Sequence, residues 1–197
     1  MRKLVLLVWL MLPVLVGAYH FGPGQQRMLL DDVSTVLAQA DERVAAEDWP
    51  SAVKKYEEAL ALLPAERVHE AQRIRLERAK AQMFDKKLPT AHQDLTSLVD
   101  ELKQSENVDE QLLFEARSAL SNSQYYMTWL MRLEGQPRER WEREIEASRQ
   151  TYRLLAEQSE RSGDAEGAKK SREDLESAIR LARMDLGELQ GLPLPSQ

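Results

Sequence analysis

The stretch VSTVLAQADERVAAEDWPSAVKKYEEALALLPAE, residues 33–66, decides the fold. Its second half opens with the turn 48–52, in which Pro50 stands where a new helix would start. A proline is tolerated in the first helical turn, because the N–H that it lacks would have no partner there. Small and aromatic residues then follow at helical spacing, and a second proline ends the helix. Residues 33–66 therefore predict two helices that pack closely as a hairpin.

This pattern resembles the second helix of a tetratricopeptide repeat (TPR), with its alanine, its aromatic residue and its closing proline. The residues that carry the signature are Trp49, Pro50, Ala52, Tyr56, Ala59 and Pro64. The turn and the start of the helix recur further on, at Pro89, Ala91 and Leu95. The resemblance implies stacked helical hairpins and a general role as a protein-binding scaffold. It does not identify the partner.

The rest of the chain also shows helical periodicity, and no segment alternates with period two. We expect seven helices, over residues 28–47, 50–63, 65–84, from 89, 107–134, 137–161 and 164–191. Asn107 is the expected N-cap of the fifth helix, with an acidic residue three positions later. Seven helices make three hairpins and one remaining amphipathic helix, which would cover the apolar end of a stack. The predicted fold is all-α: a short solenoid of antiparallel helical hairpins over residues 28–191 with a C-terminal capping helix, and an extended tail over 192–197.

An apolar N-terminal helix is expected ahead of this domain. Arg2 and Lys3 precede a long apolar run that ends in small residues at 16–18, which is typical of an export signal with a cleavage site. The alternative is a single transmembrane anchor over residues 1–22, since the run extended to that point has the length of a membrane span. A buried helix of a soluble domain is a third interpretation. Residues 23–27, which contain proline and glycine, are expected to be a linker.

Composition narrows the classes of function. Charged residues make up 30% of the chain, the formal net charge is −6, and no basic stripe is present, which argues against nucleic-acid binding. The absence of cysteine excludes disulfides, thiol nucleophiles, cysteine metal sites and a lipid-modified cysteine.

The residues that carry catalysis are scarce. Glu66 and His69 have the spacing of half a helical di-iron site, but the second copy of that motif is missing at His92. Phosphate-binding glycine loops and the local motifs of serine hydrolases and zinc proteases are also missing. We therefore predict a protein that is not an enzyme and has no cofactor, metal or small-molecule substrate.

Aromatic residues gather on two consecutive predicted helices. They are Tyr125, Tyr126, Trp129, Trp141 and Tyr152. One interpretation is that they line a groove for a protein segment, because aromatic residues are enriched at recognition sites. The other is that they fill the interface between the two helices.

Together these features predict a non-catalytic scaffold for protein–protein interactions. It would be membrane-anchored with the helical domain extracytoplasmic, or secreted or periplasmic if the N-terminal segment is cleaved. The alternatives are an extracytoplasmic helical bundle that senses a ligand, and a structural spacer.

Overall fold

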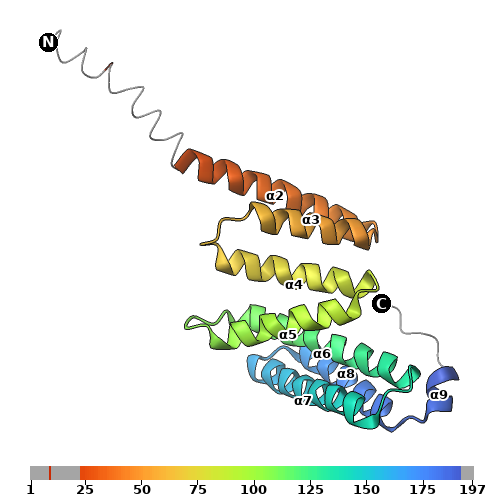
Figure 1. The fold of residues 1–197 in the computed structure, drawn as a ribbon. Coiled ribbons are helices and arrows are strands. Elements are labelled where there is room, and N and C mark those ends of the chain that lie inside the picture. The colour runs from red at the N-terminus through yellow and green to blue at the C-terminus, as the bar shows by residue number, and fades with distance from the viewer. Residues whose placement is uncertain (1–8, 10–22, 192–197) are drawn as a thin grey trace. The chain divides into compact units, whose positions relative to one another are not determined.

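The computed structural model describes residue 9 and residues 23–191, and this part of the chain is all-helical, with eight helices and no strand (Figure 1). The all-α prediction is confirmed for these residues. The predicted N-terminal signal or anchor, apart from Trp9, and the predicted tail lie outside the described residues. Within the described part, no helix is both long enough and apolar enough to cross a membrane.

The described chain divides into two compact units, the first ending at Ala71 and the second beginning at Gln72. In the first unit, α2 (Pro23–Ala45) packs against α3 (Trp49–Leu62), so the hairpin predicted over 33–66 is present. The helix begins at Pro23 and includes residues 23–27, where the sequence analysis expected a linker. Pro23 is compatible with this start because the first helical turn needs no N–H from it.

Small residues bring α2 and α3 together. Ala40 on α2 and Ala52 and Ala59 on α3 are completely buried. Tyr56 is buried as well, and its hydroxyl donates to the Asp41 carboxylate at 3.2 Å, which connects the two helices. Asp48 caps α3 by accepting a hydrogen bond from the Ser51 amide.

The second unit contains most of α4 (Val68–Phe84) and all of the later helices. These are α5 (Leu88–Gln104), α6 (Glu110–Leu133), α7 (Arg138–Ser162), α8 (Ala165–Arg183) and α9 (Leu186–Gly191). Each helix from α5 to α8 packs against the next, and α9 contacts α6. This arrangement leaves α6 in contact with α5, α7 and α9.

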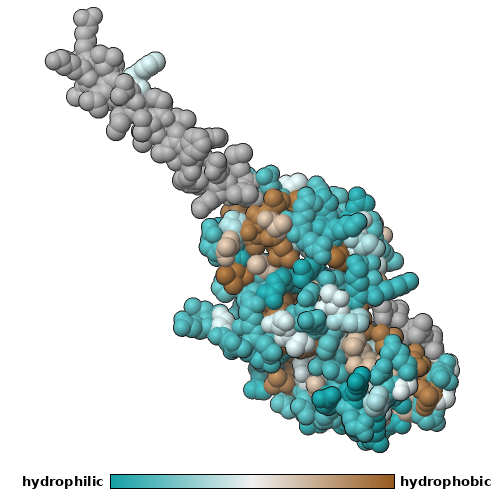
Figure 2. Space-filling model, viewed as in Figure 1, coloured by the Kyte–Doolittle hydropathy of each residue, from teal (hydrophilic) through white to brown (hydrophobic). Residues whose placement is uncertain are grey.

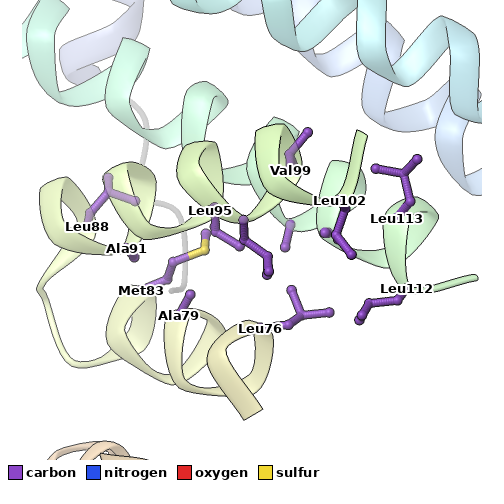
Figure 3. Close-up of a cluster of buried hydrophobic side chains, with 13 residues drawn as sticks. Leu76, Ala79, Met83, Leu88, Ala91, Leu95, Val99, Leu102, Leu112 and Leu113 are labelled. Atoms are coloured by element: carbon purple, nitrogen blue, oxygen red, sulfur yellow. The ribbon is translucent and has the colours of Figure 1, made fainter. Parts of the chain in front are cut away.

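Two apolar clusters stabilise the second unit. The first joins α4, α5 and the start of α6 through leucine, alanine and methionine side chains such as Leu76, Met83, Leu95 and Leu112 (Figure 3). The second joins α6, α7, α8 and α9 and includes Trp129. Burial of apolar surface on this scale is the main force that holds such helices together.

Charged residues add links between α4 and α5 at the edge of the first cluster. Glu101 accepts hydrogen bonds from Arg75 at 2.6 Å and from Gln72 at 2.7 Å. Burial acts to raise the pKa of Glu101, but these two donors outweigh it and the pKa is lowered. Arg78 forms a second ion pair with Asp94, at 2.7 Å.

Two helix ends differ from the predictions. The N-cap of α6 is Asp109 and not Asn107: its carboxylate accepts the Leu112 amide at 2.9 Å and pairs with Arg73 at 2.9 Å. The last predicted helix is divided into α8 and α9, so eight helices replace the predicted seven.

The division follows from a capping box. The Glu188 amide donates to the Asp185 carboxylate at 2.7 Å, and the Asp185 amide donates to the Glu188 carboxylate at 3.0 Å. On the other side of the break, the Arg132 guanidinium donates to the carbonyl oxygens of Leu181 and Met184, at the end of α8. The sequence 185–188 carries this capping signal, which the helical period of the neighbouring apolar residues obscured.

Candidate functional site

The second unit contains an apolar pocket of about 400 Å³ between α4, α6 and α8. Volumes of this order are typical of protein sites that bind small molecules or single side chains. Most of its lining comes from α6: Phe114, Glu115, Ser118, Ala119, Asn122 and Tyr126. The remainder is Lys80, Met83 and Phe84 from α4, Leu88 from α5 and Lys170 from α8.

The spacing of residues on α6 produces the hollow. Lining residues recur every three or four positions from Glu115 to Tyr126, so they share one face of the helix. The two in the middle, Ser118 and Ala119, have short side chains, whereas Phe114 lies at one end and Tyr126 at the other. A short side chain between large ones leaves an apolar depression in the helix surface.

Charged groups lie at the edge of the pocket. Lys80 pairs with Glu77 at 2.7 Å and lies 4.0 Å from Glu115, so its charge is compensated. Lys170 is exposed and forms no ion pair within 4.0 Å with the described residues. Hydrophilic residues also cover most of the surface visible in Figure 2. The pocket thus combines an apolar interior with a polar edge.

Three tyrosines lie on α6 and α7, and one of them, Tyr126, lines the pocket. The rings of Tyr125 and Tyr126 meet nearly at right angles, with centroids 5.4 Å apart. Tyr152 on α7 reaches the same region, where its hydroxyl donates to the side-chain oxygen of Asn122 at 2.6 Å. Burial, and to a lesser extent the negative charge of Asp174 on α8, raises the pKa of Tyr126 and of Tyr152. All three phenols are therefore neutral near neutral pH.

The five aromatic residues singled out in the sequence do not form one surface. Trp129 and Tyr152 are core residues, with 6% and 2% of their surfaces exposed. Tyr125 and Trp141 are half-buried against the same cluster. Of the five, Tyr126 lines the pocket. Packing thus accounts for the positions of four of them, and the fifth lies at the pocket.

The other lining residues were not singled out by the sequence analysis. Phe84, Ser118 and Lys170 lie on three helices, and no local spacing relates them. Phe84 is 40% exposed, which is unusual for a phenylalanine in a small helical protein. One sequence signal could have indicated the hollow. On α6, two adjacent residues with short side chains, Ser118 and Ala119, stand between the aromatic residues Phe114 and Tyr126.

The structure also brings together a serine, a histidine and a glutamate, which the spacing in sequence does not reveal. The His92 Nδ1 lies 3.1 Å from the Ser123 hydroxyl, and its Nε2 lies 3.6 Å from the Glu144 carboxylate. Ser123 is completely buried, and its hydroxyl donates to the Leu120 carbonyl at 2.7 Å. A serine nucleophile must instead be accessible and give its proton to the histidine. Ser123 meets neither requirement, so we interpret these contacts as links between α5, α6 and α7.

Among the described residues, no group of three or more histidine or carboxylate side chains is placed to hold a metal ion. Comparisons of the chain with protein-family models and with curated proteins found no match.

Proposed function

We propose that this protein is a non-catalytic, TPR-like scaffold that binds a segment of another protein in the pocket between α4, α6 and α8. Residues 1–22 would tether the scaffold to a membrane or direct its export, which would place the helical domain outside the cytoplasm. The three hairpins α2–α3, α4–α5 and α6–α7 would be its repeats, and α8 with α9 would form the C-terminal cap.

The observation that carries the proposal is the pocket itself. Its interior is apolar, and alternate helices of the second unit, α4, α6 and α8, form its walls. Alternate helices of stacked hairpins face the same side, and a surface built from them suits an extended or helical segment. A volume of about 400 Å³ accommodates one large apolar side chain of such a segment.

The test uses the full-length protein in native membranes. Photocrosslinking from an unnatural amino acid at position 115, on the pocket edge, is compared with crosslinking in a Ser118→Trp variant, whose indole would fill the pocket. We expect one protein partner to be crosslinked in the parent protein and at least about tenfold less in the variant, because an anchoring side chain loses its pocket. The protein should also remain in the membrane pellet after an alkaline wash.

The matched control is Ser97→Trp, the same change at an exposed position of α5 that does not line the pocket. It should crosslink like the parent. If both variants crosslink the same partner equally, the pocket is not the docking site. If the parent protein crosslinks no protein at all, the scaffold function is wrong.

The second candidate function is ligand sensing by an extracytoplasmic helical domain. The pocket volume favours it, since 400 Å³ also suits a small molecule. A small ligand that co-purifies with the parent protein and is absent from Ser118→Trp, as detected by mass spectrometry of denatured samples, would support this function over the scaffold.

A further inference from the structure

Asn122 lies on the face of α6 that lines the pocket, one turn after Ser118 and one turn before Tyr126. Its side-chain oxygen accepts a hydrogen bond from the Tyr152 hydroxyl of α7, and the two oxygens are 2.6 Å apart. That separation is typical of an O–H···O bond and is shorter than an N–H···O bond normally is. The contact therefore assigns the amide oxygen to Tyr152 and leaves the –NH2 group of Asn122 free of that contact.

Tyr152 keeps the amide in this orientation. Only 2% of its surface is exposed, and burial is the main cause that raises the pKa of its phenol, so the phenol is protonated near neutral pH. Ser148 also acts on the phenol, but its own proton goes to the Ser121 carbonyl at 3.0 Å, so it does not donate there. The phenolic proton is given to Asn122 at the short distance of 2.6 Å, and the amide cannot rotate without losing this bond.

The amide nitrogen of Asn122 is available to a ligand. It forms no hydrogen bond with the described residues, and it is not one of their fully buried side-chain atoms that lack a partner. The residue is half-buried and lines the pocket, so the accessible nitrogen borders this space. An –NH2 group donates two hydrogen bonds and accepts none. A ligand that offers it an oxygen acceptor is therefore favoured.

The charges at the pocket favour a neutral acceptor over a charged one. Lys80 pairs with Glu77 at 2.7 Å and lies 4.0 Å from Glu115. Lys170 forms no ion pair within 4.0 Å with the described residues, but Asp174 follows it by one turn of α8, and the two charges act on each other. Both signs are thus present at the pocket, so a charged ligand group would be attracted by one and repelled by the other.

We propose that the Asn122 amide donates a hydrogen bond to a main-chain carbonyl oxygen of the partner segment, that of the residue whose apolar side chain fills the pocket. This inference rests on the proposed scaffold function and specifies how the segment is held. Asn122 shares the pocket lining with the buried apolar residues Met83 and Ala119, and every residue carries a carbonyl next to its own side chain. The apolar lining would supply affinity, and the amide would fix the orientation of the segment.

The test compares three water-soluble probes that share one carbon skeleton: isocaproamide, isocaproate and isohexylamine. The amide reproduces a leucine side chain with its own carbonyl, the carboxylate adds a negative charge, and the amine replaces the acceptor by a cationic donor. Binding to the full-length protein in detergent is followed by the labelled methyl resonance of Met83, which lines the pocket and is assigned with Met83→Leu. We expect isocaproamide to bind about fivefold more tightly than either of the others, because it alone offers a neutral acceptor.

Asn122→Asp separates recognition from a purely structural role. The new carboxylate still accepts the Tyr152 proton, but it presents an acceptor to the pocket where the parent presents a donor. The preference should reverse, with isohexylamine bound at least about fivefold more tightly than isocaproamide. The matched control is Asn107→Asp, which adds the same charge at an exposed position outside the pocket lining and should bind like the parent.

Two further variants complete the test. Ser118→Trp, which fills the pocket, corrects for partition of the probes into detergent and should abolish all three Met83 shifts. Tyr152→Phe removes the hydroxyl that orients Asn122 but keeps the ring in its apolar cluster, so the ratio of amide to amine affinity should fall towards one. Thermal melts show which variants are folded, and this ratio decides the matter if Asn122→Asp does not fold.

The outcomes distinguish the two proposals. An amide preference that persists in Asn122→Asp, or an equal loss of amide and amine binding in that variant, would overturn the inference while leaving the scaffold in place. Tightest binding of isocaproate to the parent would overturn it as well, because the site would then select a negative charge. If no probe shifts the Met83 resonance and Ser118→Trp crosslinks the same proteins as the parent, both proposals fail.

Discussion

Arg132 shows how one residue can organise several helices. It lies on α6, its guanidinium stacks on the Trp141 ring of α7 at 4.8 Å, and it donates to two carbonyl oxygens at the end of α8. The last carbonyls of a helix have no partner within the helix, so a cation there satisfies them and complements the helix dipole. Burial lowers the pKa of Arg132, with Asp185 opposing, and the group stays charged at neutral pH.

At this scale we predict that Arg132→Lys lowers the free energy of unfolding by about 1–2 kcal/mol, because an ammonium group cannot bind two carbonyls in a fixed fork and stack on a ring at once. Urea denaturation measures the change. Arg153→Lys, an exposed position on α7, is the control and should change stability by less than about 0.5 kcal/mol. Equal effects in the two variants would show that the Arg132 contacts contribute nothing specific.

The turns between helices show a common device at the scale of the element. The helices α2, α4, α6 and α7 are each followed, within two residues of their last one, by a residue with positive φ: Glu47, Lys86, Gly135 and Gly163 respectively. In each turn the following amide donates back to a carbonyl five residues earlier, as in a Schellman motif. Glycine adopts this conformation without strain, whereas Glu47 and Lys86 carry a Cβ that makes it unfavourable.

We predict that Lys86→Gly raises the free energy of unfolding by about 0.5 kcal/mol. Relief of the left-handed strain, about 1 kcal/mol, is partly offset by the greater freedom of glycine in the unfolded chain. The exposed Lys86 side chain forms no ion pair with the described residues that would be lost. Lys86→Ala keeps the Cβ and should show no gain in the same thermal and urea melts. A loss of stability in Lys86→Gly would mean that entropy outweighs the strain.

At the scale of the whole molecule, the two units differ in how much they bury. Among the residues whose burial the structure describes, the core of the first consists of Val33, Val36 and Val53, three small alanines and Tyr56. The second has two apolar clusters spread over six helices. Because stability grows with the apolar area removed from water, a pair of helices is marginal on its own.

We predict that a fragment of residues 67–197, which keeps α4 whole, melts cooperatively with a helical circular dichroism spectrum. A fragment of residues 23–66 should show weak helicity and no cooperative transition, because two helices gain too little from packing to offset their ordering. The full-length protein measured alongside is the reference. A cooperative melt of 23–66, or a broad non-cooperative one of 67–197, would contradict this account.

The sequence by itself determined the helices and most of their ends. Their periodicity is local, and so is the chemistry of turns such as those at Pro50 and Pro89, where a proline starts a helix. The sequence was a less reliable guide to the helix ends where two local signals competed. At Asp109 and at Asp185, the cap was decided by which carboxylate met a backbone amide, and the same apolar period would have fitted a longer helix.

Only the tertiary structure decided which side chains are accessible. Trp129 and Tyr152 are as aromatic as Tyr126, yet packing of α6, α7 and α8 buries the first two and leaves the third at the pocket. The pocket needs residues from Lys80 to Lys170, which lie on helices distant in sequence. Such a site has no sequence signature, because the contacts that create it form only when the helices pack together.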